Sequence, residues 1–314
     1  MNKYCISKKV LLVCLFTLIS SCLLADNEKL NVFVSILPQK YFAERLLGDN
    51  GNVEVLIGAG QSIHTYEPLP QQMGKLYRAD IFFTVGIPFE HALEDRLKNL
   101  CPKLSIVASD EGINKIPMQA HHHHGHVHQN NMECDEEIDE HEEHEHHGHH
   151  HDLGLDPHFW LDPVRAAEMS GNMAKAIVTA KPELKTTIEA NQAKIVEDMA
   201  ALSEELARQM LPFKGKTMFV YHPAFGYFAE KFGLVQKAVE IEGKEPAPKQ
   251  LAELIRKCRE EDIKVIFVQK QFPANTAETV ASSINGKVVA IDPLAEKYVE
   301  NLKSMVEAFV GNVN

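Results

Sequence analysis

Three histidines and one aspartate lie far apart in the sequence but carry side chains that could bind one metal ion: His64, His158, His222 and Asp292. Imidazole nitrogens suit borderline cations such as Zn²⁺, and three imidazoles with one carboxylate can form a tetrahedral site. A single histidine near a strand end is more often an ordinary loop or core residue. The hypothesis of a metal site therefore rests on the positions that the four residues share.

Each of these residues lies at the end of a predicted element where a ligand site can form. His64, His222 and Asp292 come shortly or directly after predicted strands. These strands are residues 53–57, 217–221 and 288–291. Ligands bind at the carboxyl ends of the strands in open parallel sheets. His158 precedes a predicted helix at the junction of the two halves, whereas His91 lies in the amphipathic run FEHALEDRL and is expected on a solvated helix surface.

Strand-like and helix-like runs alternate in both halves of the chain. The predicted strands are residues 31–36, 53–57, 81–85, 104–107, 217–221, 235–241, 264–268 and 288–291. The predicted helices that follow them are residues 38–47, 69–77, 89–99, 224–232, 248–258, 274–284 and 295–309. This alternation is typical of βαβ units with parallel sheets. We therefore predict an α/β fold with two Rossmann-like (βα)4 lobes and the metal site in the cleft.

A helical region without strands separates the two halves. Asp162 followed by Pro163 is a typical helix start, because the aspartate accepts from free backbone N–H groups and proline suits the first turn. A second long helix is predicted at residues 183–210. The boundaries that we predict are an N-terminal α/β lobe at residues 26–162, one long rigid linker helix at 163–181 and a C-terminal α/β lobe at 182–314. Since a helix does not swivel as a loop does, the lobes should move little relative to each other.

The start of the chain has the pattern of an export signal. Three lysines precede an apolar run at residues 10–19, and the whole apolar stretch is shorter than the roughly 20 residues that span a bilayer. We predict a cleaved signal peptide at residues 1–25. The run ISSC, which ends at Cys22, resembles a bacterial lipobox, so a lipid anchor at Cys22 is one alternative and an uncleaved anchor helix is another.

Histidine is concentrated in one segment of the 314-residue chain. Thirteen of the 17 histidines lie between residues 121 and 151, with nine acidic residues and neither Lys nor Arg. Without this segment the formal net charge of −12 falls to −3, and the balance argues against a nucleic-acid-binding protein, which would show a basic stripe. We predict that residues 120–152 form a disordered loop that binds additional zinc ions weakly, because ordering a flexible loop costs entropy.

Other motifs give little support for catalysis or for a disulfide framework. Beyond the predicted signal, Cys101, Cys134 and Cys258 remain, an odd number without CxxC spacing, and a single Cys101–Cys258 bridge is left open. The sequence contains no G-x-S-x-G, and no G-x-G-x-x-G follows a strand. No complete Walker A motif occurs, so any ATP-driven step would need another chain. We predict that the protein is not an enzyme.

Four motifs together resemble a known family. They are HTYEP at residues 64–68, DPHFWLDP at 156–163, YHPAFGYF at 221–228 and EPAP at 245–248. In this order they are similar to the zinc type of the metal-binding receptors of bacterial ABC importers (ZnuA-like, cluster A-I). The resemblance implies two α/β lobes bridged by one long helix, with the metal between them. It also implies His64, His158 and His222 as ligands, with Asp292 or a water as the fourth.

The resemblance also implies a function. We expect an exported, periplasmic, monomeric receptor that captures Zn²⁺ with high affinity and delivers it to an ABC permease in the inner membrane, which a separate ATPase drives. Histidine at position 222, where manganese-type relatives often have glutamate, favours zinc. The alternatives are a manganese or iron receptor on the same scaffold, or an exported zinc hydrolase, because three histidines and a water can also be catalytic.

Overall fold

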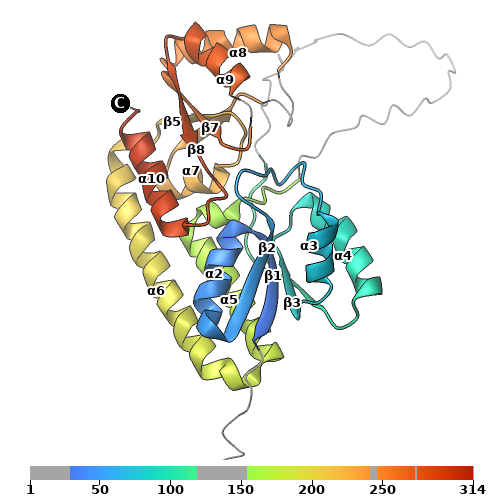
Figure 1. The fold of residues 1–314 in the computed structure, drawn as a ribbon. Helices are drawn as coiled ribbons and strands as arrows, with labels where there is room; N and C mark the ends of the chain where they lie inside the picture. Colours follow the sequence, from blue (N-terminus) through green and yellow to red (C-terminus); the bar gives the residue numbers. More distant parts are fainter. Residues whose placement is uncertain (1–28, 119–153, 241–245, 273, 314) are drawn as a thin grey trace, which may run out of the picture.

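The computed structural model describes residues 29–118, 154–240, 246–272 and 274–313 (Figure 1). The predicted signal peptide at residues 1–25 and the predicted histidine-rich loop at 120–152 lie outside the described residues, and so does Cys134. Within the described ranges, no helix combines the length and the apolar character that a membrane crossing requires.

The N-terminal lobe is a four-stranded parallel sheet in the order β2-β1-β3-β4. Its strands are β1 (Leu30–Ile36), β2 (Gly51–Ile57), β3 (Ile81–Thr84) and β4 (Ser105–Ala108). Its helices are α2 (Leu37–Leu47), α3 (Pro70–Leu76) and α4 (Pro88–Leu100), with the short η1 (Gly48–Asn50) after α2. Helices lie on both sides of the sheet (Figure 1), so the two central strands are buried almost throughout.

The C-terminal lobe repeats this arrangement, with a parallel sheet in the order β6-β5-β7-β8. Its strands are β5 (Thr217–Val220), β6 (Val235–Ala238), β7 (Val265–Gln269) and β8 (Lys287–Ile291). Its helices are α7 (Gly226–Phe232), α8 (Pro248–Glu260), α9 (Asn275–Ser283) and α10 (Tyr298–Val310). The prediction of two α/β lobes with parallel sheets is therefore confirmed, because in each lobe a helix connects every strand to the next strand of the same sheet.

One predicted strand is shorter than expected, and the difference shapes the site. The run at residues 235–241 leaves the sheet after Ala238. Its partner β5 ends at Val220, and Pro223 soon afterwards has no N–H to donate to a neighbouring strand. The N–H of Glu240 still donates to the carbonyl oxygen of Tyr221 at 3.0 Å. Glu240 is thereby held beside the end of β5 instead of continuing a strand.

Two helices connect the lobes, α5 (Pro163–Ala180) and α6 (Lys185–Met210), with η3 (Pro182–Leu184) between them and η4 (Leu211–Phe213) after α6. Oδ1 of Asp162 accepts from the N–H of Val164 at 2.9 Å and so caps α5, as the sequence predicts. The long helix that contacts both lobes is α6, which packs against α2, α7 and α10 (Figure 1). The helix that we expected as the linker, at residues 163–181, is α5, which packs against α6. The domain boundaries at residues 162 and 181 stay a prediction.

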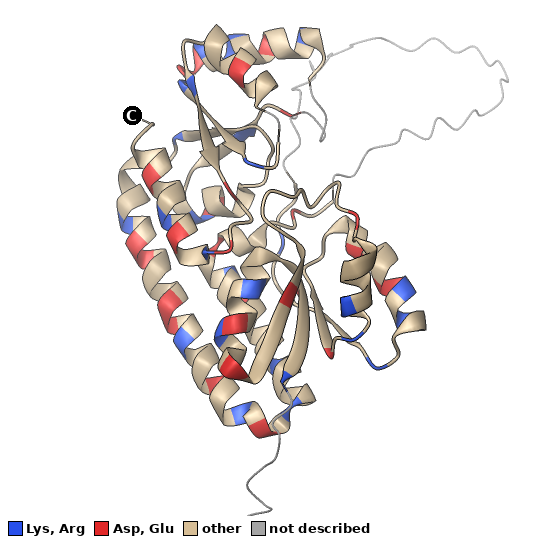
Figure 2. Ribbon diagram, viewed as in Figure 1, with Lys and Arg blue, Asp and Glu red and all other residues tan. Residues whose placement is uncertain are grey.

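Charged side chains of both signs alternate along the outer surface of α6 (Figure 2). Several form ion pairs one helical turn apart, such as Lys194 with Asp198 at 2.8 Å. Exposed pairs of this kind contribute only a few tenths of a kcal/mol each. The stability of the connection therefore comes mainly from the buried apolar face of α6.

The junction between the lobes is held by buried hydrogen bonds around η2 (Phe159–Leu161). Trp160 is fully buried, and its Nε1–H donates to the carbonyl oxygen of Pro293 at 2.8 Å. The hydroxyl of Tyr298 donates to the carbonyl oxygen of Trp160 at 2.6 Å. A continuous apolar cluster with residues from both sheets surrounds these groups. The relative position of the lobes is thus set by packing and by buried polar groups that are paired.

Both cysteines that the structure describes are free and buried. Cys101 follows α4 in the N-terminal lobe, whereas Cys258 lies in α8 of the C-terminal lobe. The bridge that the sequence left open between them is therefore not formed. Burial raises the pKa of the Cys258 thiol to about 12, which keeps it protonated and unreactive at neutral pH.

We predict that Tyr298→Phe lowers the free energy of unfolding by about 1–3 kcal/mol, because it leaves the buried carbonyl of Trp160 without its donor. Urea unfolding measures this loss. The matched control is Tyr77→Phe, which removes the hydroxyl of an exposed tyrosine and should change stability by less than about 0.5 kcal/mol. Equal effects of the two substitutions would show that the junction does not depend on this hydrogen bond.

Candidate metal centre

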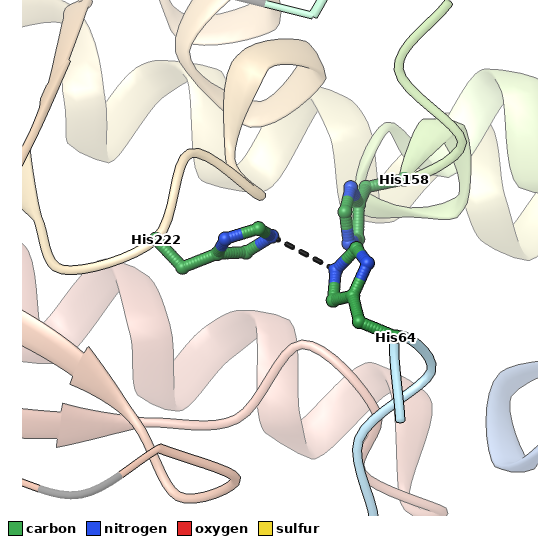
Figure 3. Close-up of side chains that lie close together, drawn as sticks. All are labelled: His64, His158 and His222. Carbon is green, nitrogen blue, oxygen red and sulfur yellow. Dashed lines mark hydrogen bonds between the residues drawn. The ribbon is translucent and has the colours of Figure 1, made fainter. Parts of the chain in front are cut away.

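Three imidazole rings converge between the two lobes (Figure 3). One ring nitrogen from each of His64, His158 and His222 lies within 4.8 Å of the other two. His64 Nε2 and His222 Nε2 are 3.0 Å apart, and the ring centroids are separated by 4.6 to 6.0 Å. Among the residues that the structure describes, this is the one group of histidine, cysteine and acidic side chains with the spacing of a metal site.

The three histidines come from three separate parts of the fold. His64 lies in the loop between β2 and α3, and His222 follows β5 at its carboxyl end. His158 lies directly before η2, at the start of the connection between the lobes. The parallel sheets bring the first two to facing edges, and the buried segment before α5 brings the third between them. His91 is exposed on α4, as its amphipathic pattern predicts.

Asp292 lies near the site but is not one of the converging groups. It follows β8 directly, as expected, and it is half-buried. Its Oδ1 accepts from Nε2 of Gln271 at 2.8 Å and from the N–H of Leu294 at 2.9 Å. The structure therefore brings together three of the four predicted site residues and engages the fourth with its own neighbours.

Two buried carboxylates hold two of the rings in place. Nδ1 of His158 lies 2.7 Å from Oδ1 of Asp156, and Nδ1 of His222 lies 2.6 Å from Oε2 of Glu240. A carboxylate can only accept, so each Nδ1 carries the hydrogen and each Nε2 presents a lone pair to the centre. Carboxylates in this position fix the ring orientation and raise the basicity of the ligand nitrogen.

Sequence reasoning assigned no role to these two carboxylates. Asp156 has a local signal, since it stands two residues before His158 in the same motif. Glu240 has none, because it is 18 residues from His222 and reaches it only through the pairing of β5 with β6. The ring centroid of Trp160 lies 5.3 Å from that of His158.

Apolar and amide side chains fix His222 from the other sides. The ring of Phe272 stacks on the imidazole with centroids 4.9 Å apart and an interplanar angle of 21°. The fully buried Gln269 donates from Nε2 to the carbonyl oxygen of His222 at 2.7 Å. Gln269 ends β7 and Phe272 follows it three residues later, so the end of β7 helps to fix the position of His222.

Burial and mutual repulsion favour the neutral form of His64 and His222. Burial first, and then the proximity of His222 and His158, lowers the pKa of His64 below its ordinary value, although part of His64 is exposed. Burial also lowers the pKa of His222, against the opposing influence of Glu240. Because His222 presents a lone pair, the 3.0 Å contact requires His64 to donate its Nε2–H in the metal-free protein. A bound cation would replace that hydrogen.

Two cavities meet at the three rings. The inner one, lined by all three histidines, has a volume of about 10 Å³, the space of a single water-sized guest. The outer one has a volume of about 440 Å³ and forms the mouth above His64 and His222. A larger hollow of about 1040 Å³ lies against β1 and β2 and contains none of the histidines. The volume of a cavity therefore does not identify the candidate metal site, whereas the three histidines that line the inner cavity do.

The arrangement has the chemistry of a preformed site for a borderline dication. Three neutral nitrogen ligands suit Zn²⁺ and similar ions better than hard cations, which prefer oxygen. The two carboxylates behind the rings partly compensate the charge of a bound dication without occupying coordination positions. The inner cavity is small, so an ion placed in it would lie close to all three rings.

Comparisons with known proteins agree with this chemistry. The sequence model of a family described as ZnuA, zinc-uptake complex component A, periplasmic, matches residues 32–312. The zinc-binding protein AdcA of Streptococcus pyogenes serotype M3 is 28% identical over 284 residues, which are 90% of this chain and 53% of AdcA. The chain thus spans about half the length of AdcA. The high-affinity zinc uptake system protein ZnuA of Bacillus subtilis is 30% identical over 275 residues, 86% of this chain and 80% of that protein.

Solved structures share the same architecture. A crystal structure of ZnuA superposes with a TM-score of 0.78 at 28% identity, covering 91% of this chain and 99% of the other. The Zn(II)-bound AdcA of Streptococcus pneumoniae superposes with a TM-score of 0.69 at 26% identity, covering 90% of this chain and 57% of the other. The resemblance therefore extends over both lobes and the helices between them.

We predict that Glu240→Gln weakens the binding of Zn²⁺ about tenfold, because a neutral amide holds Nδ1 of His222 less firmly than a carboxylate does. Competition with a chromophoric chelator measures the affinity. Glu253→Gln on α8, which removes a carboxylate exposed outside the site, serves as the control and should bind as the wild type does. Wild-type affinity in Glu240→Gln would exclude an orienting role for this carboxylate.

The lowered pKa values predict how the metal-free protein responds to acid. Unfolded histidines take up protons near pH 6.5, whereas folded His64 and His222 resist protonation, so the unfolded chain binds more protons below that pH. Their contribution to stability is present above about pH 6.5 and is lost as the pH falls below it.

Urea unfolding of the metal-free protein at pH 7.5 and pH 5.5 should reveal this loss. The double variant His64→Gln/His222→Gln should lose less stability between the two pH values than the wild type does. An identical loss in both proteins would assign the acid sensitivity to other groups.

Proposed function

The chain belongs to the ZnuA family of periplasmic zinc-uptake components, and on this premise we propose that it is an exported receptor that binds Zn²⁺ tightly and delivers it to a membrane permease. The single observation that carries the proposal is the convergence of three ring nitrogens between the two lobes. Zn²⁺ is the cargo of this site and not a cofactor of a reaction. The zinc-binding and zinc-uptake descriptions of the relatives support the same conclusion.

We propose His64, His158 and His222 as the protein ligands of the ion. Their neutral state favours capture near neutral pH, because a protonated imidazole cannot bind a metal. For the fourth position two candidates remain, Asp292 and a water molecule. A majority of imidazole ligands favours zinc over manganese, so a manganese or iron receptor on the same scaffold is the less favoured alternative.

The site also bears on the hydrolase alternative. A zinc hydrolase needs a general base that is free to take a proton from a metal-bound water. The carboxylates of Asp156 and Glu240, which contact the imidazoles, are both engaged as acceptors from Nδ1 groups. Glu67 is exposed, and Asp292 is bound to Gln271. These contacts support a receptor whose site holds the ion without performing chemistry on it.

The remaining parts of the proposal concern export and delivery. Residues 1–25 would direct export to the periplasm, with a lipid anchor at Cys22 as a variant. A monomer of the chain would hand the ion to an inner-membrane ABC permease whose separate ATPase supplies the energy. Residues 120–152 would hold further zinc ions weakly, because their clustered histidines and carboxylates can bind transition-metal ions.

We predict that His64→Ala, His158→Ala and His222→Ala each weaken the tight Zn²⁺ site by about 100-fold or more, beyond the effect of removing an outer partner. Calorimetry with chelator competition measures the affinity, and elemental analysis counts the tightly bound ions. His91→Ala on the exposed face of α4 is the matched control and should leave the affinity unchanged.

A variant lacking residues 121–151 tests the position of the site from the other direction. It should retain one tightly bound ion and lose only weak binding. If the tightest site disappears with that segment, or if all three alanine variants bind as the wild type does, the placement of the site is wrong.

A further inference from the structure

Gln271 has an acceptor atom that no described residue uses. It lies two positions after the end of β7 and lines the small inner cavity together with the three histidines. Its Oε1 is buried and has no hydrogen-bond partner among the described residues. A buried acceptor without a donor costs free energy, so such an atom needs an explanation. Gln269, two residues earlier, is in contrast bonded through its amide to the backbone of His222.

Asp292 determines which way the Gln271 amide points. The strands β7 and β8 pair in parallel, with Gln269 opposite Ile291, so the residues that follow them lie side by side. Oδ1 of Asp292 accepts from Nε2 of Gln271 at 2.8 Å. A carboxylate cannot donate, and the reversed amide would place two oxygens against each other. The orientation with Oε1 away from Asp292 is therefore the one that the contacts require.

Asp292 is itself held in a fixed position. Its Oδ1 also accepts from the N–H of Leu294 at 2.9 Å, and its carbonyl oxygen accepts from Nδ2 of Asn301 on α10 at 2.6 Å. Oδ1 of Asp292 already accepts two hydrogen bonds. This carboxylate is therefore better placed to hold Gln271 than to bind a metal ion. The unused acceptor belongs instead to Gln271, a residue that lines the inner cavity.

We propose that Oε1 of Gln271 accepts a hydrogen bond from the water that completes the coordination of the bound cation, and that Asp292 positions this amide instead of binding the metal. The inference rests on the proposed function, since it requires an ion at the three histidines. A water on a dication is a strong donor, because the metal draws electron density from it and lowers its pKa. In this arrangement three imidazoles and one water bind the ion, and the otherwise unused Oε1 of Gln271 accepts from that water.

The test compares single and double variants of the full chain with Zn²⁺ and with Co²⁺, whose visible spectrum reports coordination. Gln271→Leu should weaken Zn²⁺ binding about tenfold and keep the four-coordinate Co²⁺ spectrum, because water remains in the fourth position. Asp292→Ala should weaken binding by no more than Gln271→Leu does. The double variant should bind like Gln271→Leu alone, because Asp292 acts through the glutamine.

Gln192→Leu is the matched control, a half-buried glutamine on α6 that contacts Ser170 and Ala167. Both leucine variants should unfold at similar urea concentrations without metal, whereas only Gln271→Leu should lose affinity. Wild-type affinity in Gln271→Leu overturns the inference, and so does a larger loss in Asp292→Ala that persists in the double variant, because Asp292 is then a ligand. A wild-type protein that binds no Zn²⁺ refutes the proposed function itself.

Discussion

Three imidazole nitrogens held close together in their neutral form are the constraint on which the rest of the molecule depends. Such nitrogens repel one another once protonated, and in the metal-free protein only His64 can relieve the crowding, by donating to His222. The fold has to supply the energy that keeps them there. Buried carboxylates hold the rings of His158 and His222, and the ring of Phe272 stacks on His222.

The two sheets bring His64 and His222 together because parallel strands all end at the same edge. β2 leads into the loop with His64, β5 ends at His222, and these edges face each other across the cleft. The segment around η2 then inserts His158 between them and is tied to the C-terminal lobe through Trp160. A small displacement of one lobe would separate the nitrogens, and the buried aromatic residues Trp160 and Tyr298, with their hydrogen bonds across the junction, oppose such a displacement.

Charge is arranged in layers around the centre. The innermost layer consists of the three imidazoles, and the next contains the carboxylates of Asp156 and Glu240. Gln271, whose Oε1 has no partner among the described residues, also lines the inner cavity. A dication placed in this environment gains the ligand bonds and the attraction of two nearby negative charges. Neutral nitrogen ligands at the same time disfavour hard cations, so selectivity and affinity come from the same side chains.

Local patterns in the sequence determined the strands, the helices, the caps and the candidate ligands, because periodicity and helix-start signals act over a few residues. The eight strand predictions lie within a few residues of the observed ones. His64 and His222 were singled out because they follow predicted strands, and His158 because it precedes a predicted helix between the two halves. Only the tertiary structure decided that Glu240 orients His222, that Asp292 holds Gln271, and that α6 is the helix in contact with both lobes. These contacts join residues that strand pairing and lobe packing bring together. The spacing of such residues along the chain carries no signal of the contact, so the sequence alone could not predict it.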